Sequence, residues 1–135
     1  MSPRYLYKMR RTFDLWLLIV VVVTALPVAL SAHLKLTKSS PPEGANVSTS
    51  AVKQLQLWFN EEPLLPMSSV LLTGPNGSVK VERPRASDER SLTVTVGQAL
   101  PAGAYRISWK AAGDDGHVVT GTVDFTVKES TRPPM

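Results

Sequence analysis

The chain has 135 residues and no cysteine, and its formal net charge is +4 at neutral pH. This length favours one domain, and the lack of cysteine excludes disulfides, iron–sulfur clusters, thiolate metal sites and cysteine nucleophiles. Four of the 15 basic residues and one of the 11 acidic residues lie within residues 1–32, so the remainder has a net charge of only +1. Because that remainder holds no block of Lys or Arg, we expect no nucleic-acid partner.

The first 32 residues have the pattern of a secretory signal peptide. They begin with basic residues, continue as an apolar run from Leu15 to Leu30, and end in the small residues Ser31 and Ala32. Signal peptides are cleaved after such small residues, whereas a membrane span needs about 20 apolar residues. We therefore expect residues 1–32 to be removed and the protein to be exported, to the periplasm or elsewhere in the cell envelope. An uncleaved leader would instead anchor the protein to a membrane.

Two cleavage positions remain open. A cut after Ala32 makes His33 the first residue of the mature chain, but it leaves Leu30, a mediocre residue, two places before the final leader residue. A cut after Ser31 has the smaller Ala29 at that earlier place. The choice decides which residue carries the free α-amine.

From residue 33 onward the pattern is that of short, half-buried β-strands. Apolar and polar residues alternate in "HLKLTKS", "KQLQLWFN", "RSLTVTVGQ", "AYRISWK" and "HVVTGTVDFTV", with the two-residue period of a strand that buries one face. "GPNG" predicts a turn between two strands, and "SPPEGANVST" predicts a loop. About seven strands predict an all-β fold over residues 33–128, an immunoglobulin-like antiparallel β-sandwich with Greek-key connections. Residues 129–135 are expected to form a flexible tail.

Large apolar side chains on these strands are expected to fill the space between two sheets. Met67 is expected to pack in the core as well, since a thioether side chain fills irregular gaps. Most of the aromatic residues are expected to be core or half-buried, namely Trp58, Phe59, Tyr105, Trp109 and Phe125.

The chain has two histidines, and both stand where a metal ion can be bound. If cleavage follows Ala32, the free α-amine of His33 and its Nδ1 can chelate one metal ion together. Asp115 and His117 are separated by one residue, so their side chains project from the same face of an extended backbone. Nitrogen and carboxylate ligands without a thiolate suit copper(II), which favours tetragonal sites. "GDDG" is also an ordinary turn sequence in which an Asp caps its own backbone.

The chain resembles the CopC family of periplasmic copper-binding proteins from His33 to about Lys128. "AHLKLTKSSPPEG" is similar to the family's start, a histidine followed by Ser-x-Pro-x-x-Gly, and "LQLWFNEEP" is similar to its strand ending in Phe-Ser-Glu. "LPAGAYRISWKAAGDDGHVVTGTVDFTV" resembles the family's most diagnostic block, which contains Asp-x-His. The order of the three pieces, with His33 directly after a leader, makes the resemblance specific.

The resemblance implies a copper(II) site of the histidine-brace type. His33 would supply its amine and imidazole, and Asp115 and His117 would complete the ligand set. Glu61 falls where the family has a carboxylate near this site, so it is either a ligand or a neighbouring group. An equally open alternative is that Glu61 is a solvated residue at a strand end.

The resemblance further implies a role in copper homeostasis or resistance. The protein would sequester copper or deliver it to a CopD-like membrane copper transporter. Some family members carry a Met-rich loop for copper(I), but "LTGPNGSVKVERPRASDER" contains neither Met nor His. We therefore expect no site built from several thioethers here.

Two other functions stay open at the level of sequence. One is a copper mono-oxygenase-like enzyme, because a histidine brace can also activate oxygen. The short chain leaves little sequence for a broad substrate surface, so we expect no enzyme. The other is an immunoglobulin-like interaction module that binds no metal.

Overall fold

The computed structural model describes residues 33–87 and 90–130. The expected leader, residues 1–32, and most of the expected tail, residues 131–135, lie outside the described residues. Within the described ranges, no helix has the length and apolar character needed to cross a lipid bilayer. The elements in chain order are β1 (Leu36–Ser40), β2 (Ala45–Ser48), β3 (Gln54–Phe59), the 3₁₀ helix η1 (Leu65–Met67), β4 (Ser69–Gly74), β5 (Gly77–Val79), β6 (Arg85–Ser87), β7 (Ser91–Thr95), β8 (Gly103–Ala112) and β9 (Val118–Lys128).

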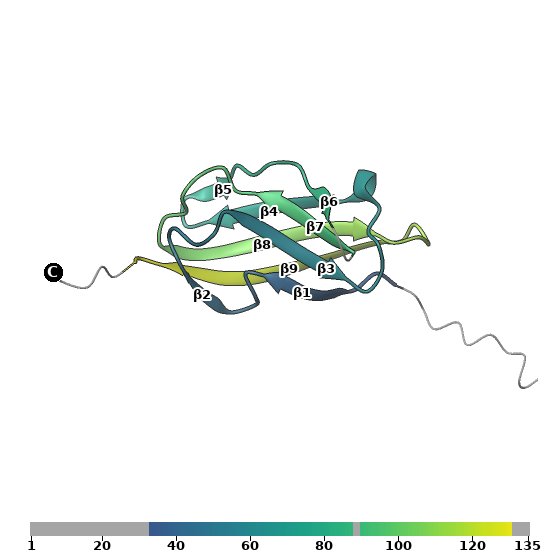
Figure 1. Cartoon of the computed structure of the whole chain (residues 1–135), viewed down its shortest axis with the longest axis horizontal. Coiled ribbons are helices and arrows are strands. Elements are labelled where there is room, and N and C mark those ends of the chain that lie inside the picture. Colours follow the sequence, from purple (N-terminus) through teal and green to yellow (C-terminus); the bar gives the residue numbers. More distant parts are fainter. Residues whose placement is uncertain (1–32, 88–89, 131–135) are drawn as a thin grey trace, which may run out of the picture. The chain divides into compact units, whose positions relative to one another are not determined.

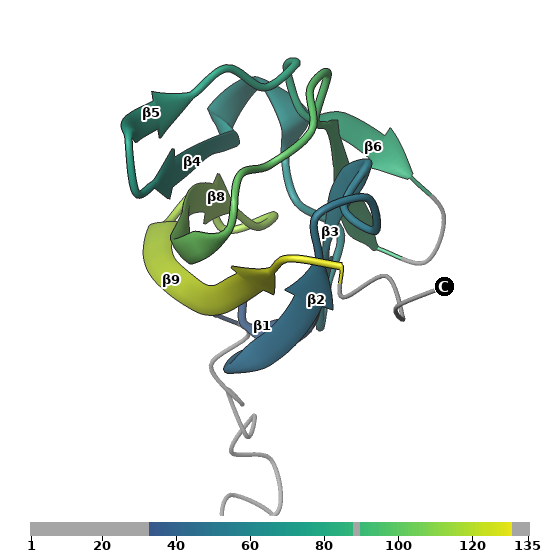
Figure 2. The same cartoon turned by 90° about the vertical axis from the view of Figure 1, so that its left-hand side faces the viewer.

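The strands form two sheets packed face to face (Figures 1 and 2). One sheet has the order β1-β3-β7-β6 and the other has the order β2-β9-β8-β4-β5. Every pairing is antiparallel except that of β2 with β9. The predicted immunoglobulin-like β-sandwich is confirmed. The described residues contain nine strands rather than about seven, because the sequence pattern did not indicate β2 and β6, which are short strands of four and three residues at sheet edges.

The prediction of a continuous loop over "SPPEGANVST" was wrong, since this segment contains β2. Pro41 and Pro42 lack the N–H groups that would continue the pairing of β1 with β3. The chain then turns at Gly44, whose φ is +72° and whose N–H donates to the carbonyl of Asp124 at 2.7 Å. The next four residues pair with β9 in parallel. This pairing depends on a strand far away in sequence, so the local composition gave no sign of it.

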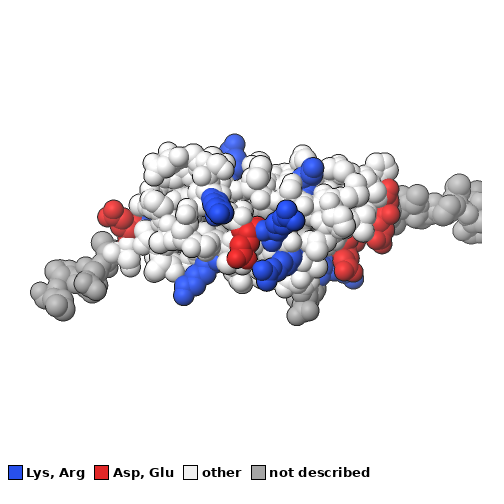
Figure 3. Space-filling view, turned by 90° about the horizontal axis from the view of Figure 1, so that it is seen from above, with Lys and Arg blue, Asp and Glu red and all other residues white. Residues whose placement is uncertain are grey.

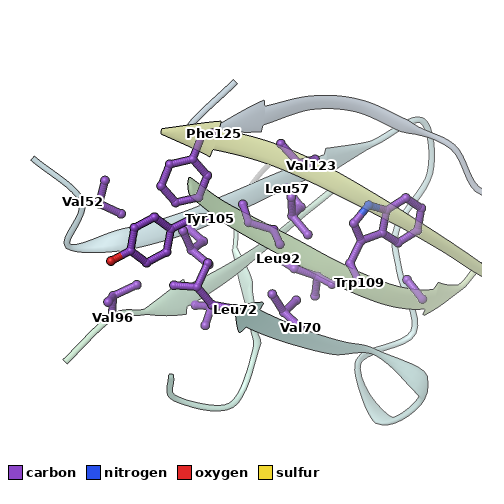
Figure 4. Packing of buried hydrophobic residues seen from close by; sticks show 14 of the residues in the cluster. Val52, Leu57, Val70, Leu72, Leu92, Val96, Tyr105, Trp109, Val123 and Phe125 are labelled. Carbon is purple, nitrogen blue, oxygen red and sulfur yellow. The ribbon is translucent and has the colours of Figure 1, made fainter. Parts of the chain in front are cut away.

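The core lies between the two sheets and is built from alternate residues of their strands (Figure 4). Phe59 meets Trp109 edge-to-face with ring centroids 5.3 Å apart, and Tyr105 stacks on Phe125 at 5.4 Å. Trp58 is half-buried on the outer face, where the ammonium of Lys38 lies 4.6 Å from its ring centroid. The predicted core or half-buried placement of these aromatics is confirmed. The large side chains with almost no exposure are Leu34, Leu55, Leu57, Leu72, Leu92, Leu100 and Ile107.

The prediction that Met67 packs in the core was wrong. Met67 is 40% exposed and ends η1, none of whose residues is buried. The segment before it is fixed by the N–H of Leu64, which donates to the carbonyl of Ala112 at 2.8 Å. Hydrophobic character favours burial but does not say which apolar residues of a loop reach the interior.

The hairpin of β8 and β9 places Asp115 and His117 at one end of the sandwich. These strands pair continuously from Gly103 with Val127 to Ala112 with Val118. The turn between them, residues 113–117, lies at the same end as the start of β1 and the end of β3 (Figure 1). Gly116 has φ of +74°, and its N–H donates to the carbonyl of Gly113 at 2.9 Å.

Two neighbouring leucines on β4 test the placement of the core. Leu72 is 0% exposed and Leu71 is 62% exposed. We predict that Leu72→Ala lowers the free energy of unfolding by about 2–5 kcal/mol, because it leaves a cavity between the sheets. Leu71→Ala, the matched control, should change it by less than about 0.5 kcal/mol. Urea unfolding measures both, and equal losses would contradict the assigned faces of β4.

Candidate metal centre

His33, Asp115 and His117 come together at the end of the sandwich. Each offers one potential ligand atom, and these atoms all lie within 4.8 Å of one another. Nδ1 of His33 lies 3.5 Å from Oδ2 of Asp115, and Nδ1 of His117 lies 2.9 Å from the same oxygen. The two imidazole rings meet edge-to-face with centroids 5.6 Å apart. One carboxylate oxygen thus faces two imidazoles that come from opposite ends of the described chain.

The turn after β8 fixes Asp115 through its own backbone. Oδ1 of Asp115 accepts the main-chain N–H of His117 at 3.0 Å, which is the capping contact expected of an Asp in a turn. Oδ2, the other oxygen, points to the two histidine rings. The capping role and a metal-ligand role are therefore compatible, because each uses a different oxygen of the same carboxylate.

The surroundings of Asp115 favour its charged form. The hydrogen bond with the ring of His117 lowers the pKa of this carboxyl most, and the main-chain N–H of His117 lowers it further. Desolvation of the carboxyl acts in the opposite direction on this pKa, and the charges of His117 and His33 add smaller contributions to the lowering. A carboxylate held in its anionic form beside two imidazoles is suited to receiving a cation.

The group is open to solvent. The side chains of His33, Asp115 and His117 are 54%, 34% and 71% exposed. Acidic side chains gather at the right-hand end of the molecule in Figure 3, the end where Figure 1 shows the β8–β9 turn. An ion can therefore reach this group, or leave it, without any opening of the core.

Glu61, the fourth predicted site residue, is not part of this group. It is half-buried, and its carboxylate lies against Gly113, where any Cβ would collide with Oε1. This oxygen is buried and has no hydrogen-bond partner among the described residues. Glu61 is therefore partly shielded from solvent, and its Oε1 packs against Gly113 in the turn that carries Asp115.

Asn60 contacts the segment that carries His33 and was not singled out from the sequence. Its Oδ1 accepts the N–H of Lys35 at 2.7 Å, and its Nδ2 donates to the carbonyl of His33 at 3.2 Å. The sequence does hold a signal, because Asn often bonds to main-chain groups and here it directly follows the strand β3. The main-chain partners of Asn60 lie within its reach only because β1 pairs with β3.

Comparison with known proteins identifies the family. The CopC domain matches residues 36–128. "Copper resistance protein C" of Xanthomonas campestris pv. juglandis is 34% identical over 119 residues, which cover 82% of this chain and 92% of that protein. The chain therefore belongs to the CopC family.

Two solved structures have the same fold. The crystal structure of PcoC, described as a methionine-rich copper resistance protein from Escherichia coli, has a TM-score of 0.65 and 33% identity, covering 72% of this chain and all of that one. CopC from Methylosinus trichosporium OB3b has a TM-score of 0.66 and 27% identity, covering 76% of this chain and all of that one. In contrast to the methionine-rich PcoC, the present sequence has only four methionines.

The contact between Asp115 and His117 predicts how Asp115 titrates in the metal-free protein. Because the pKa of Asp115 is lowered in the folded state, its carboxylate stabilises the fold above the unfolded-state pKa, about 3.9. That contribution should be lost as the pH falls below this value and through the folded-state pKa. NMR titration of the Asp115 side chain should give a midpoint below about 3.9, returning toward it in His117→Ala. An unchanged midpoint in that variant would contradict the assigned contact.

Proposed function

We propose that this protein is an exported copper(II)-binding protein of the cell envelope, most simply of the periplasm. Removal of residues 1–32 gives a mature domain, residues 33–128, that begins with His33. The free amine and imidazole of His33 then bind one copper(II) ion, with Asp115 and His117 completing the ligand set. The observation that carries this proposal is the convergence of the three potential ligand atoms within 4.8 Å.

The donor set suits copper(II) for chemical reasons. Imidazole nitrogen and carboxylate oxygen are borderline and hard ligands, and copper(II) heads the affinity order of the divalent first-row metals at such sites. Soft ligands are scarce, since the sequence has no cysteine and the described part of the chain has one methionine, Met67. Glu61 supports the site from beneath, by packing against Gly113.

Copper is cargo in this proposal, held for sequestration or delivery. Relatives of the chain are named copper resistance proteins. The ligand group is exposed and lies on a turn and a chain end, so handing over an ion requires local movement only. We propose a CopD-like membrane copper transporter as the partner that receives or supplies the ion.

Oxygen activation is the less suitable use of this site. A mono-oxygenase needs a position at the metal that is free for oxygen, and here Oδ2 of Asp115 lies between the two imidazoles. Electrode measurements of oxygen consumption by the copper-loaded protein with a reductant separate the two functions. If the protein only binds copper, oxygen consumption should not exceed that of the metal-free protein with the same reductant.

Single substitutions test the ligand set. The test uses protein that begins at His33. We predict that each of three substitutions weakens copper(II) binding: His33→Ala, Asp115→Ala and His117→Ala. Loss of a residue that only contacts a ligand typically weakens binding by about 10–100-fold, and loss of a ligand itself should weaken it more. Competition with a chelator of known affinity measures this.

Asp114→Ala is the matched control, since this neighbouring carboxylate is exposed and not in the three-residue group. It should keep the affinity within about twofold, because it removes an exposed charge that water and salt screen and not one of the proposed ligands. Retention of full affinity in all three ligand variants would overturn the proposed site.

The position of the free amine gives a separate prediction. Intact-mass measurement of the exported protein should show His33 as the first residue. Protein extended by Ala32 should bind copper(II) more weakly, because the nitrogen of His33 is then an amide. Affinity of the shorter protein should rise with pH until the α-amine has lost its proton, near about pH 8, and the extended protein should lack this component. Equal affinities and pH profiles would exclude the amine as a ligand.

A further inference from the structure

Asn60 occupies the place where the pairing of β1 with β3 reaches the candidate metal centre. The last pair of this ladder is Leu36 with Phe59, which follows a shift in register between Leu36 and Lys38. One position further, the N–H of Asn60 donates to the carbonyl of Lys35 at 3.1 Å. In a regular antiparallel pair the carbonyl of Asn60 would accept the N–H of Lys35 in return.

That return bond is made by a side chain instead of the main chain. The main-chain carbonyl of Asn60 accepts a hydrogen bond from Nη1 of Arg90 at 2.7 Å and so is taken up by another partner. Oδ1 of Asn60 accepts the N–H of Lys35 at 2.7 Å in its place. The same amide group then reaches further, because its Nδ2 donates to the carbonyl of His33 at 3.2 Å. The Asn60 side chain thus extends the pairing of β1 to the first described residue.

Two neighbouring contacts hold Asn60 and His33 in this arrangement. The carbonyl of Arg90 accepts the N–H of Phe59 at 3.0 Å, so Arg90 holds the end of β3 through both its main-chain carbonyl and its guanidinium. Leu34 is 1% exposed and fixes the segment to the core directly after His33. Leu34 alone leaves the peptide between His33 and Leu34 free to turn. The bond from Asn60 to the carbonyl of His33 orients this peptide and so fixes the position of the His33 Cα.

We infer that Asn60 is a positioning residue for the metal centre. It holds the Cα of His33 in a position from which the amine and imidazole of that residue can reach the ion beside Asp115 and His117, before metal arrives. This inference rests on the proposed function, because a chelating amine exists only when His33 is the first residue.

The physical reason is the usual mobility of a chain end. The first residues of a domain fray unless they are tied down, and a ligand group that is correctly placed only part of the time binds proportionally more weakly. The hydrogen bonds of the Asn60 side chain go to main-chain atoms of Lys35 and His33 and to none of the three potential ligand side chains. Its effect on copper must therefore pass through the backbone of His33.

A double-mutant cycle tests this on protein that begins at residue 33, which contains the entire core. Asn60→Ala should weaken copper(II) binding about tenfold when His33 is present, as loss of an outer-sphere partner does. In the His33→Ala background the same substitution should change the affinity by less than about twofold, because the residue it positions is gone. Asn46→Ala is the control: this exposed Asn lies on β2, pairs with Thr126, and should leave the affinity unchanged.

Two further measurements separate positioning from general destabilisation. The amide hydrogen of Lys35 should exchange faster in metal-free Asn60→Ala, while amides in the middle of β8 should keep their rates. Spin-resonance spectra of copper-loaded Asn60→Ala should show a mixture of copper species where the unmodified protein shows one.

Three results would contradict the role of Asn60 or the proposed function itself. Copper affinity within twofold of the unmodified protein in Asn60→Ala would overturn the inference and leave the proposed function standing. An equal loss in both backgrounds would also overturn it, because the effect would then not pass through His33. If His33→Ala alone does not weaken binding, the proposed function fails first and the inference fails with it.

Discussion

The long antiparallel pairing of β8 with β9 is the constraint on which the rest of the structure depends. These two strands form the centre of the five-stranded sheet, with β4 on one side and β2 on the other. Their inward side chains supply Tyr105, Trp109 and Phe125 to the core, and the turn at their end carries Asp115 and His117. The same pairing therefore fixes both the packing between the sheets and the position of two candidate ligands.

The candidate centre has a packed side toward the core and an exposed side toward solvent. On the packed side, Glu61 fills the space beside Gly113. Above it, both imidazoles and the Asp115 carboxylate are open to water. Exposed ligands on a rigid base suit a protein that holds an ion and gives it up again, because release needs no disruption of the core.

The second half of the candidate centre, His33, comes from the segment that leads into the other sheet. His33 precedes β1, and its place beside Asp115 follows from the pairing of β1 with β3, the burial of Leu34 and the two side-chain bonds of Asn60. A metal site assembled in this way links three separate segments. Copper bound there would add a cross-link between the two sheets at their open end.

The sequence by itself determined an all-β fold, because strict two-residue alternation over short segments is typical of half-buried antiparallel strands. It also singled out His33, Asp115 and His117, since their residue types and the spacing of Asp115 and His117 are properties of the chain alone. Only the tertiary structure decided the placement of β2, Met67, Glu61 and Asn60. Each placement depends on a contact distant in sequence: β9 for β2, the bond of Leu64 to Ala112 for the segment of Met67, Gly113 for Glu61 and the residues before β1 for Asn60. Local patterns report which face of a strand is buried, but they do not report which strand lies next to it.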